Sequence, residues 1–310
     1  MSKQVCRTIQ HVNGIIKFDS NSQNYTDIGG GFDDYCPPVE GSETGKCNND
    51  EQKVSSSFIG FINMLISNND KENIESDKLA EYAILWLSYK LNQKAQNSGI
   101  KLNDFYTNHI KTHAHYNKKI TNCKDNTTNK EFIDKKKYLM NMDITDISNF
   151  YEAFDILCKL YNTCNETSKK CTDCSQNAEN FSQKYNKLNE DSNNKSNSYK
   201  NILYNLSTDY NNLKEYISEK CSDSSNISSF PEIEIPPGPF EIIEATSSSS
   251  IASKLIPVLF IFSAIPVFLG IAYKTIFKGK DKKNKEGNES LYMIRILAII
   301  PGTLIVIDIC

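Results

Sequence analysis

The sequence predicts an all-α protein: a disulfide-stapled helical bundle followed by a C-terminal transmembrane helix. Three observations lead to this prediction. Before residue 221, apolar residues recur at helical spacing in five separate stretches. No alternating apolar and polar run of useful length indicates a strand. Finally, residues 255–273 carry no charge, in a chain whose mean hydropathy is −0.49.

Composition limits the class of protein. A chain of 310 residues allows one or two domains, and 39% hydrophobic residues are enough for a packed core. The formal net charge of −3 gives no basic face of the kind that binds nucleic acid. We therefore expect no nucleic-acid partner.

The first fifty residues allow two predictions. The opening stretch has no run of seven apolar residues and no small-residue cleavage site, so no signal peptide is expected there. Residues 19–50 contain Gly29, Gly30 and Gly31, the pair Pro37-Pro38 and two cysteines. This composition predicts an irregular, cysteine-containing loop.

The helical stripes follow that loop. "EQKVSSSFIGFINMLIS" (51–67) and "ISNFYEAFDILCKLY" (147–161) are amphipathic, whereas "KLAEYAILWLSYKLN" (78–92) is apolar almost all round and belongs at the centre of a bundle. Two more stripes cover residues 177–188 and 199–217. The polar break "NEDSNNKSN" between them favours an antiparallel helical hairpin.

Composition shifts divide the rest of the chain. A Ser- and Pro-rich stretch without lysine predicts an extended linker with no packed core of its own. The next stretch is predicted to be a transmembrane helix. Its uncharged residues, 255–273, would form a helix about 28 Å long, close to the thickness of a hydrocarbon core. The predicted segments are the helical domain 1–221, the linker 222–250, the transmembrane helix 251–273, a lysine-rich segment 274–290 and an apolar tail 291–310.

The flanks of the predicted span give its orientation. Six lysines lie within twelve residues after it, and the stretch before it is mainly acidic. Lysine is enriched on the cytosolic side of membranes, so the segment 274–290 is expected in the cytosol and the domain on the other side. Cysteine usage agrees with this orientation, because nine of the ten cysteines precede the span.

The tail allows two interpretations. Residues 296–307 are uncharged, and as a helix they would cover about 18 Å, less than a full span. A longer span would have to include Arg295 and Asp308, at a cost of roughly 2.5–3.5 kcal/mol for each at a helix centre. We favour a membrane-associated tail or an artefact of the gene model over a second span.

The cysteines are candidates for disulfide bonds. Cys158, Cys164, Cys171 and Cys174 form the tightest group, and it lacks both the second close pair of a zinc site and the context of a redox motif. Cys36 and Cys47 flank the turn-rich loop and could pair, and Cys158 is either a staple or a buried thiol. The candidates are Cys6, Cys36, Cys47, Cys123, Cys158, Cys164, Cys171, Cys174 and Cys221, an odd number that leaves at least one thiol unpaired or joined to another chain.

No motif indicates catalysis or a cofactor. His109, His113 and His115 have spacings compatible with a helical metal site, but the acidic partner of such a site is missing and a solvated face is the favoured interpretation. The glycine-rich stretch at 29–31 lacks the lysine and helix start of a phosphate loop. We expect no catalytic residues, cofactor, metal or small-molecule substrate.

Five segments, in order along the chain, carry a resemblance to a known family. They are "FDDYCP" (32–37), "AEYAILWLSYKLN" (80–92), "MDITDISNFYEAFDILCKLYN" (142–162), "CSQNAENFSQKYNKLNEDSN" (174–193) and "IPVLFIFSAIPVFLGIAYK" (256–274). Together they resemble the Plasmodium interspersed repeat (PIR) proteins of malaria parasites, in the rodent-malaria branch called yir, bir and cir. The resemblance covers residues 6–274 and stops before the apolar tail.

The resemblance implies a helical, disulfide-containing domain, one C-terminal transmembrane helix and export into or onto the infected red cell. It also implies that a cleavable signal peptide is generally absent. The family is associated with antigenic variation and host interaction and has no enzymatic activity attached to it. It contributes no catalytic or ligand residues that could be transferred to this chain.

The sequence thus predicts a non-enzymatic, exported variant surface antigen that is displayed on a linker and meets host proteins or antibodies. The exposed loops proposed for variation are residues 19–50, 122–129 and 164–174. Two alternatives remain: an adhesin for one host receptor, and a scaffold on export or vacuolar membranes whose domain stays in a reducing compartment.

Overall fold

The computed structural model describes most of the N-terminal region and two strands near the C-terminus. The described residues are 1–69, 74–94, 101–121, 123, 126–164, 174–220, 230–239, 294–300 and 303–309. The chain divides into two units, Met1–Ala245 and Thr246–Cys310, and each is considered by itself.

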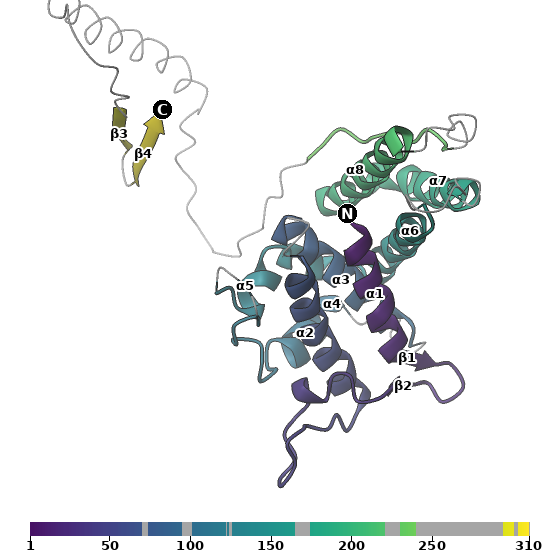
Figure 1. Cartoon of the computed structure of the whole chain (residues 1–310), viewed down its shortest axis with the longest axis vertical. Helices are drawn as coiled ribbons and strands as arrows, with labels where there is room; N and C mark the ends of the chain where they lie inside the picture. Colours follow the sequence, from purple (N-terminus) through teal and green to yellow (C-terminus); the bar gives the residue numbers. More distant parts are fainter. Residues whose placement is uncertain are drawn as a thin grey trace, which may run out of the picture. The chain divides into compact units, whose positions relative to one another are not determined.

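The first unit is a bundle of helices with one small hairpin (Figure 1). The long helices are α1 (Lys3–Ile15), α2 (Asp50–Asn68), α3 (Ser76–Asn92), α6 (Ile144–Thr163), α7 (Cys174–Glu190) and α8 (Asn197–Lys220). The short helical segments are η1 (Asp33–Tyr35), α4 (Leu102–Phe105), η3 (Tyr106–Ile110), α5 (Asn129–Asp134), η4 (Lys137–Asn141) and η6 (Asp191–Asn194).

The predicted stripes all form helices, with ends within a few residues of the expected ones. The helical fold is confirmed in this respect. Local signals explain several ends: the Asn49 side chain accepts from the Gln52 N–H at the start of α2, and Asp143 accepts from Thr145 and Asp146 at the start of α6. Thr128 and Glu131 form a reciprocal capping box at the start of α5.

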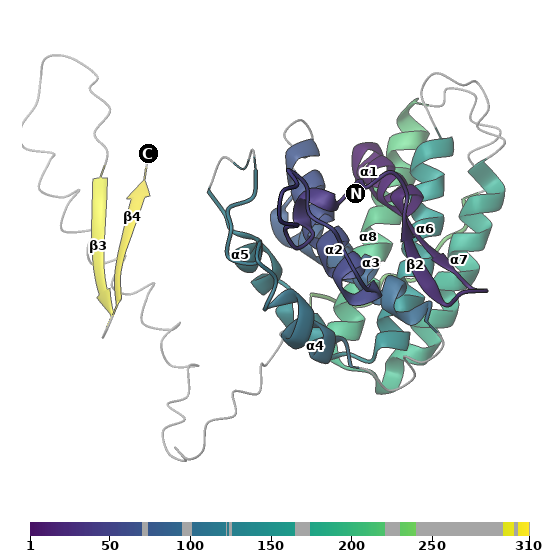
Figure 2. The same cartoon turned by 90° about the horizontal axis from the view of Figure 1, so that it is seen from below.

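Helix α3 lies in the middle of the bundle, as its nearly uniform apolar surface predicts. It packs between α2 and α6, and views from two directions place α6, α7 and α8 together on one side of it (Figures 1 and 2). Trp86 on α3 is fully buried, and its Nε1–H donates to Asn13 Oδ1 of α1 at 3.0 Å. Asn13 Nδ2 in turn donates to the Tyr151 hydroxyl of α6 at 2.8 Å. One amide therefore links three helices.

A buried carboxylate ties the start of the chain to α3 and α8. Asp209 on α8 is fully buried and accepts from the Met1 amino group at 2.7 Å, from Lys78 Nζ at 2.5 Å and from the Tyr82 hydroxyl at 2.6 Å. A buried carboxylate with this many donors is compensated for its lost hydration. Asp209 thus fixes α1 and α3 against α8.

Helices α7 and α8 form the expected antiparallel hairpin. The Tyr199 hydroxyl of α8 donates to the Leu188 carbonyl of α7 at 3.0 Å. Further from the turn, the rings of Phe181 and Tyr210 stack with centroids 4.7 Å apart. As residue numbers fall along α7 they rise along the facing part of α8, which is the pairing of antiparallel helices.

Three parts of the first unit differ from the sequence predictions. Helix α1 occupies the start of the chain, where no helix was expected. Strands β1 (Ile16–Asp19) and β2 (Asn24–Asp27) form an antiparallel hairpin, and β2 lies inside the stretch 19–50 that was predicted to be wholly irregular. The hairpin is too short to produce the alternation by which strands are recognised in a sequence.

The third difference concerns the linker. Residues 230–239 pack on the bundle: Phe230 and Ile233 are buried, the Tyr210 hydroxyl donates to the Pro231 carbonyl, and the Tyr185 hydroxyl donates to the Glu234 carbonyl. The stretch 222–250 is predicted to be extended with no packed core of its own; residues 230–239 form no helix or strand, but they pack on the domain, which the sequence did not indicate. The rest of the linker lies outside the described residues.

The second unit contains one hairpin of strands β3 (Ile294–Ile300) and β4 (Thr303–Ile309). They pair antiparallel, with Ile294 opposite Ile309 and Arg295 opposite Asp308. The tail is thus extended here, and the helical form considered for residues 296–307 is not what the structure has. The predicted transmembrane helix 251–273 and the lysine-rich segment 274–290 lie outside the described residues. Of the helices that are described, none combines the length and apolarity needed to cross a bilayer.

Candidate functional site

Six of the nine candidate cysteines form three disulfides in the described residues. Cys6 of α1 joins Cys158 of α6, and both are fully buried. Cys36 joins Cys47, and Cys164 joins Cys174 across the connection between α6 and α7. Cys123 is a free, half-buried thiol. Cys171 and Cys221 lie outside the described residues.

These bonds resolve two questions that the sequence left open. Cys158 is a staple, and its partner is 152 residues away at the start of the chain. Cys36 and Cys47 do pair with each other, and they close the base of the turn-rich loop. In the chain-entropy account, the long closure stabilises the fold by about 5 kcal/mol and each short one by about 3 kcal/mol.

The loop closed by Cys36 and Cys47 has a fixed base and an exposed tip. At the base, the Lys46 N–H donates to the Pro37 carbonyl at 2.9 Å, and Gly45 packs so closely that a Cβ there would lie 2.4 Å from the Cys36 carbonyl oxygen. Residues 37–44 are all exposed, and Val39 keeps 41% of its surface in water. The tip therefore projects from a rigid attachment.

The loop is anchored on α2 by aromatic packing. Phe32 is buried against Gly60 of α2, where a Cβ would come within 2.4 Å of the Phe32 ring. A side chain larger than hydrogen at position 60 would displace that ring. The small residue in the apolar stripe of α2 thus makes room for the start of the loop.

A histidine completes the anchor. The His115 N–H donates to His113 Nδ1 at 3.2 Å, so the other ring nitrogen, Nε2, carries the proton and faces Ser56 Oγ at 3.2 Å. Ser56 Oγ then donates to the Tyr35 carbonyl of the loop at 3.1 Å. Burial, with a smaller contribution from the neighbouring His115, lowers the pKa of His113 to about 4.

The three histidines do not form the solvated helical face that was favoured. His113 is packed beneath the loop, His115 lies against the Tyr35 ring with centroids 5.3 Å apart, and His109 is on the π-helical turn η3. Only His109 belongs to a helical segment, because the chain turns irregularly after Ile110. Among the described residues no group of three metal-binding side chains is present.

The other two predicted loops are described only in part. Of residues 122–129, positions 122, 124 and 125 lie outside the described residues, and the rest lead into the start of α5. Between Cys164 and Cys174, all nine intervening residues lie outside them. The structure therefore characterises one of the three loops, the one between β2 and α2.

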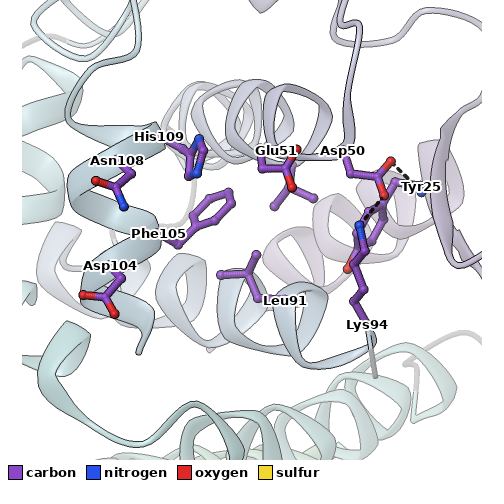
Figure 3. A pocket seen from close by; sticks show the side chains of 10 residues that line it. Tyr25, Asp50, Glu51, Leu91, Lys94, Asp104, Phe105, Asn108 and His109 are labelled. Carbon is purple, nitrogen blue, oxygen red and sulfur yellow. Dashed lines mark hydrogen bonds and ion pairs between the residues drawn. The ribbon is translucent and has the colours of Figure 1, made fainter. Parts of the chain in front are cut away.

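Beside this loop the domain has a cavity of about 270 Å³, formed by the start of α2, the end of α3 and the segment α4–η3 (Figure 3). Val54, Leu91 and Phe105 provide apolar side chains, while Glu51 and Asp104 come from opposite walls. The remaining lining residues are Tyr25, Asp50, Lys94, Asn108 and His109. No sequence pattern indicated this site, because its residues come from four segments that only the fold brings together.

Similar proteins are found both among protein families and among solved structures. The family described as "Plasmodium variant antigen protein Cir/Yir/Bir" matches residues 6–274. A solved structure described as "Structure of a Plasmodium PIR protein ectodomain" is similar with a TM-score of 0.54 and 34% sequence identity. The match covers 76% of this chain and 98% of that one. No match is found among curated protein sequences.

The family match covers most of the chain, and the structural match is an ectodomain from the same group of proteins. Both agree with the resemblance carried by the five sequence segments. This chain therefore belongs to the Plasmodium Cir/Yir/Bir (PIR) variant antigen family.

Proposed function

We propose that this protein is an exported variant surface antigen of the infected red cell, anchored by residues 251–273, with its helical domain on the non-cytosolic side. The segment 274–290 would lie in the cytosol, where its lysines are favoured. The domain would meet host proteins or antibodies, and the proposal involves display and binding, with no catalysed reaction.

The observation that carries this proposal is the buried disulfide between Cys6 and Cys158. Both residues are fully buried, and the bond joins α1 to α6 between positions 152 residues apart in the sequence. Disulfides of this kind persist in oxidising compartments and are rare in the cytosol. They favour a translocated domain over the alternative of a scaffold held in a reducing compartment.

Display is compatible with variation because the frame and the loop are separate. The disulfides and the Asp209 contacts hold the helices, whereas residues 37–44 are exposed and contribute nothing to the core. Substitutions at exposed sites away from special contacts usually change stability by less than about 0.5 kcal/mol. The tip can therefore change its surface chemistry without loss of the fold.

Protease treatment of intact infected cells tests the location and the topology together. We expect added trypsin to remove the domain and leave residues 274–285 intact, as detected with antibodies against each part. Cleavage of residues 274–285 while the domain survives would show that the topology is the opposite of the proposed one. A domain that is cleaved only after the red cell membrane is permeabilised would contradict surface display.

Thiol labelling of the same cells tests the compartment independently. When intact cells are lysed directly into denaturant with an excess of alkylating reagent, the reagent should label Cys123 and leave Cys6, Cys158, Cys36 and Cys47 unlabelled until a reductant is added. Cys123 serves as the internal control, since it is the free thiol of the described residues. Full labelling of all five without reductant would favour the scaffold alternative.

A further inference from the structure

The cavity beside the disulfide-closed loop has a floor suited to an aliphatic stem. Val54, Leu91 and Phe105 keep only 1%, 6% and 7% of their surfaces exposed. The His109 ring lies against Phe105 with centroids 4.8 Å apart and extends the apolar wall (Figure 3). A hydrocarbon chain placed on this floor would leave water for an apolar surface that is already ordered.

The charges around the cavity are not balanced. Asp50 is already satisfied, because its carboxylate accepts from the Tyr25 N–H and from Lys94 Nζ, each at 3.0 Å. The side-chain carboxylates of half-buried Glu51 and exposed Asp104 make no ion pair or hydrogen bond to any other residue of the described part of the chain. Since Lys94 is the only lysine or arginine among the described residues of the lining, the carboxylates of Glu51 and Asp104 have no cation beside them.

A favourable interaction with a helix dipole does not account for the presence of both Glu51 and Asp104. Glu51 is in the first turn of the long helix α2, where an acidic residue interacts favourably with the helix dipole. Asp104 is in α4, which has only four residues and a correspondingly small dipole. Figure 3 shows the two side chains on different walls of the cavity, with Phe105 between them. What the two residues share is that both line the cavity.

We infer that this cavity binds a lysine or arginine side chain presented by another protein. The stem of such a side chain would lie on Val54, Leu91 and Phe105, and its charged end would reach Glu51 and Asp104. The Phe105 ring adds an attractive face for a cation.

The size of the cavity points to a single side chain. Pockets for small-molecule ligands usually measure about 300–1,000 Å³, and this one is at or below that range. When a basic side chain on a protein surface enters the cavity, the backbone and neighbouring residues of that protein would contact the rim of the cavity. This inference goes beyond display, because it names the chemistry of a partner, and it holds on whichever side of a membrane the domain lies.

Ligand-observed NMR with the full-length protein in detergent tests the inference directly. The probes are the N-acetyl methylamides of lysine, arginine and norleucine, and saturation-transfer titrations give the dissociation constant of each. Norleucine has a hydrocarbon stem without the charge. We expect lysine and arginine to bind at least about fivefold more tightly than norleucine, with the advantage falling as NaCl rises from 50 to 500 mM. Equal binding of all three would overturn the inference.

Two substitutions that preserve shape locate the binding. Glu51→Gln and Asp104→Asn should each weaken lysine binding about two- to fivefold and leave norleucine binding unchanged. The double variant should abolish the preference for the charged probes. Glu190→Gln, at an exposed position at the end of α7, is the matched control and should have no effect.

Fold integrity is checked on the same samples by thermal unfolding. Because neither carboxylate makes an ion pair or hydrogen bond that these changes break, we expect Asp104→Asn to melt like the parent and Glu51→Gln to melt at most slightly lower, through the loss of its interaction with the helix dipole of α2. A double variant that melts like the parent and still prefers lysine over norleucine would show that the cavity is not the binding site.

Discussion

Asp209 is the residue whose loss should destabilise the domain most. Its buried carboxylate receives the Met1 amino group, Lys78 and the Tyr82 hydroxyl. Asp209→Asn removes the charge but keeps the shape, which leaves two cations facing a neutral amide. Breaking a buried ion pair in this way costs about 3–5 kcal/mol. Urea unfolding should show this loss, whereas Asp191→Asn at an exposed position should be neutral. A loss below about 1 kcal/mol at Asp209 would contradict the role given to this contact.

His113 should make the stability of the domain depend on pH in the mildly acidic range. Its pKa is about 4 in the folded state and near 6.5 in the unfolded chain. The unfolded state therefore binds the proton more strongly, so the contribution of His113 is fully present above pH 6.5 and is lost as pH falls toward 4. The physical reason is that the charged form of this partly buried ring would lose its hydration, and the neighbouring His115 disfavours the charge as well.

Thermal unfolding between pH 7 and pH 4.5 measures this effect. The parent should lose about 1 kcal/mol more than a His113→Gln variant across that range, after allowance for the partial exposure of the ring. His11→Gln, at an exposed position on α1, is the control and should keep the slope of the parent. Identical slopes for the parent and His113→Gln would show that this ring is not the titrating group.

At the scale of elements, two of the disulfides should differ in their effect: one should stabilise the whole domain, and the other should mainly hold one loop. The bond from Cys6 to Cys158 joins α1 to α6, so Cys6→Ala with Cys158→Ala should cost about 4–5 kcal/mol in the free energy of unfolding. Cys36→Ala with Cys47→Ala opens only a loop whose base has other attachments. That variant should lose at most about 3 kcal/mol but become rapidly cleavable within residues 37–46.

Urea unfolding and limited proteolysis of the two double variants together check this separation. The prediction fails if opening the loop between Cys36 and Cys47 destabilises the domain as much as separating α1 from α6 does.

The segment 230–239 should behave as part of the domain. Phe230 packs near Tyr210 with ring centroids 6.0 Å apart, and two tyrosine hydroxyls donate to backbone carbonyls of the segment. A chain ending at residue 221 exposes Tyr185 and Tyr210 and should be about 2–4 kcal/mol less stable than one ending at 239. Phe230→Ala in the longer chain should reproduce part of the loss. Equal melting temperatures of the two chains would show that residues 230–239 do not stabilise the domain.

The sequence was sufficient for the long helices because each buries a stripe that repeats at 3.6 residues. Helix α1 has the same signal in Val5, Cys6, Ile9 and Val12, with polar residues on its other faces, so this helix too is predictable from the sequence. The pairing of Cys6 with Cys158 and the cavity around Phe105 had no local signal at all. Both depend on which helices meet, and a repeat along one helix does not say which partner it faces.

At the scale of the whole molecule, the two units make different demands on their surroundings. The helical unit carries its apolar side chains inside and satisfies its buried charges, so water on all sides suits it. The hairpin of the second unit is almost entirely apolar in sequence, with Arg295 opposite Asp308 as the single charged pair in its register. A two-stranded hairpin is marginal in water by itself, and a lipid surface next to the proposed span would suit its composition.

The direction of the hairpin predicts the side on which the chain ends. Each strand has seven residues and reaches about 23 Å, short of a hydrocarbon core of roughly 30 Å. Because Ile294 is paired with Ile309, the chain leaves the hairpin at the end where it entered. If residues 251–273 span the membrane and 274–290 lie in the cytosol, an epitope tag after Cys310 should therefore be cytosolic. Antibody access in selectively permeabilised cells measures this, with a tag inserted after Thr44 as the control for the opposite side. A C-terminal tag found on the same side as the helical domain would require a second crossing and would defeat the prediction.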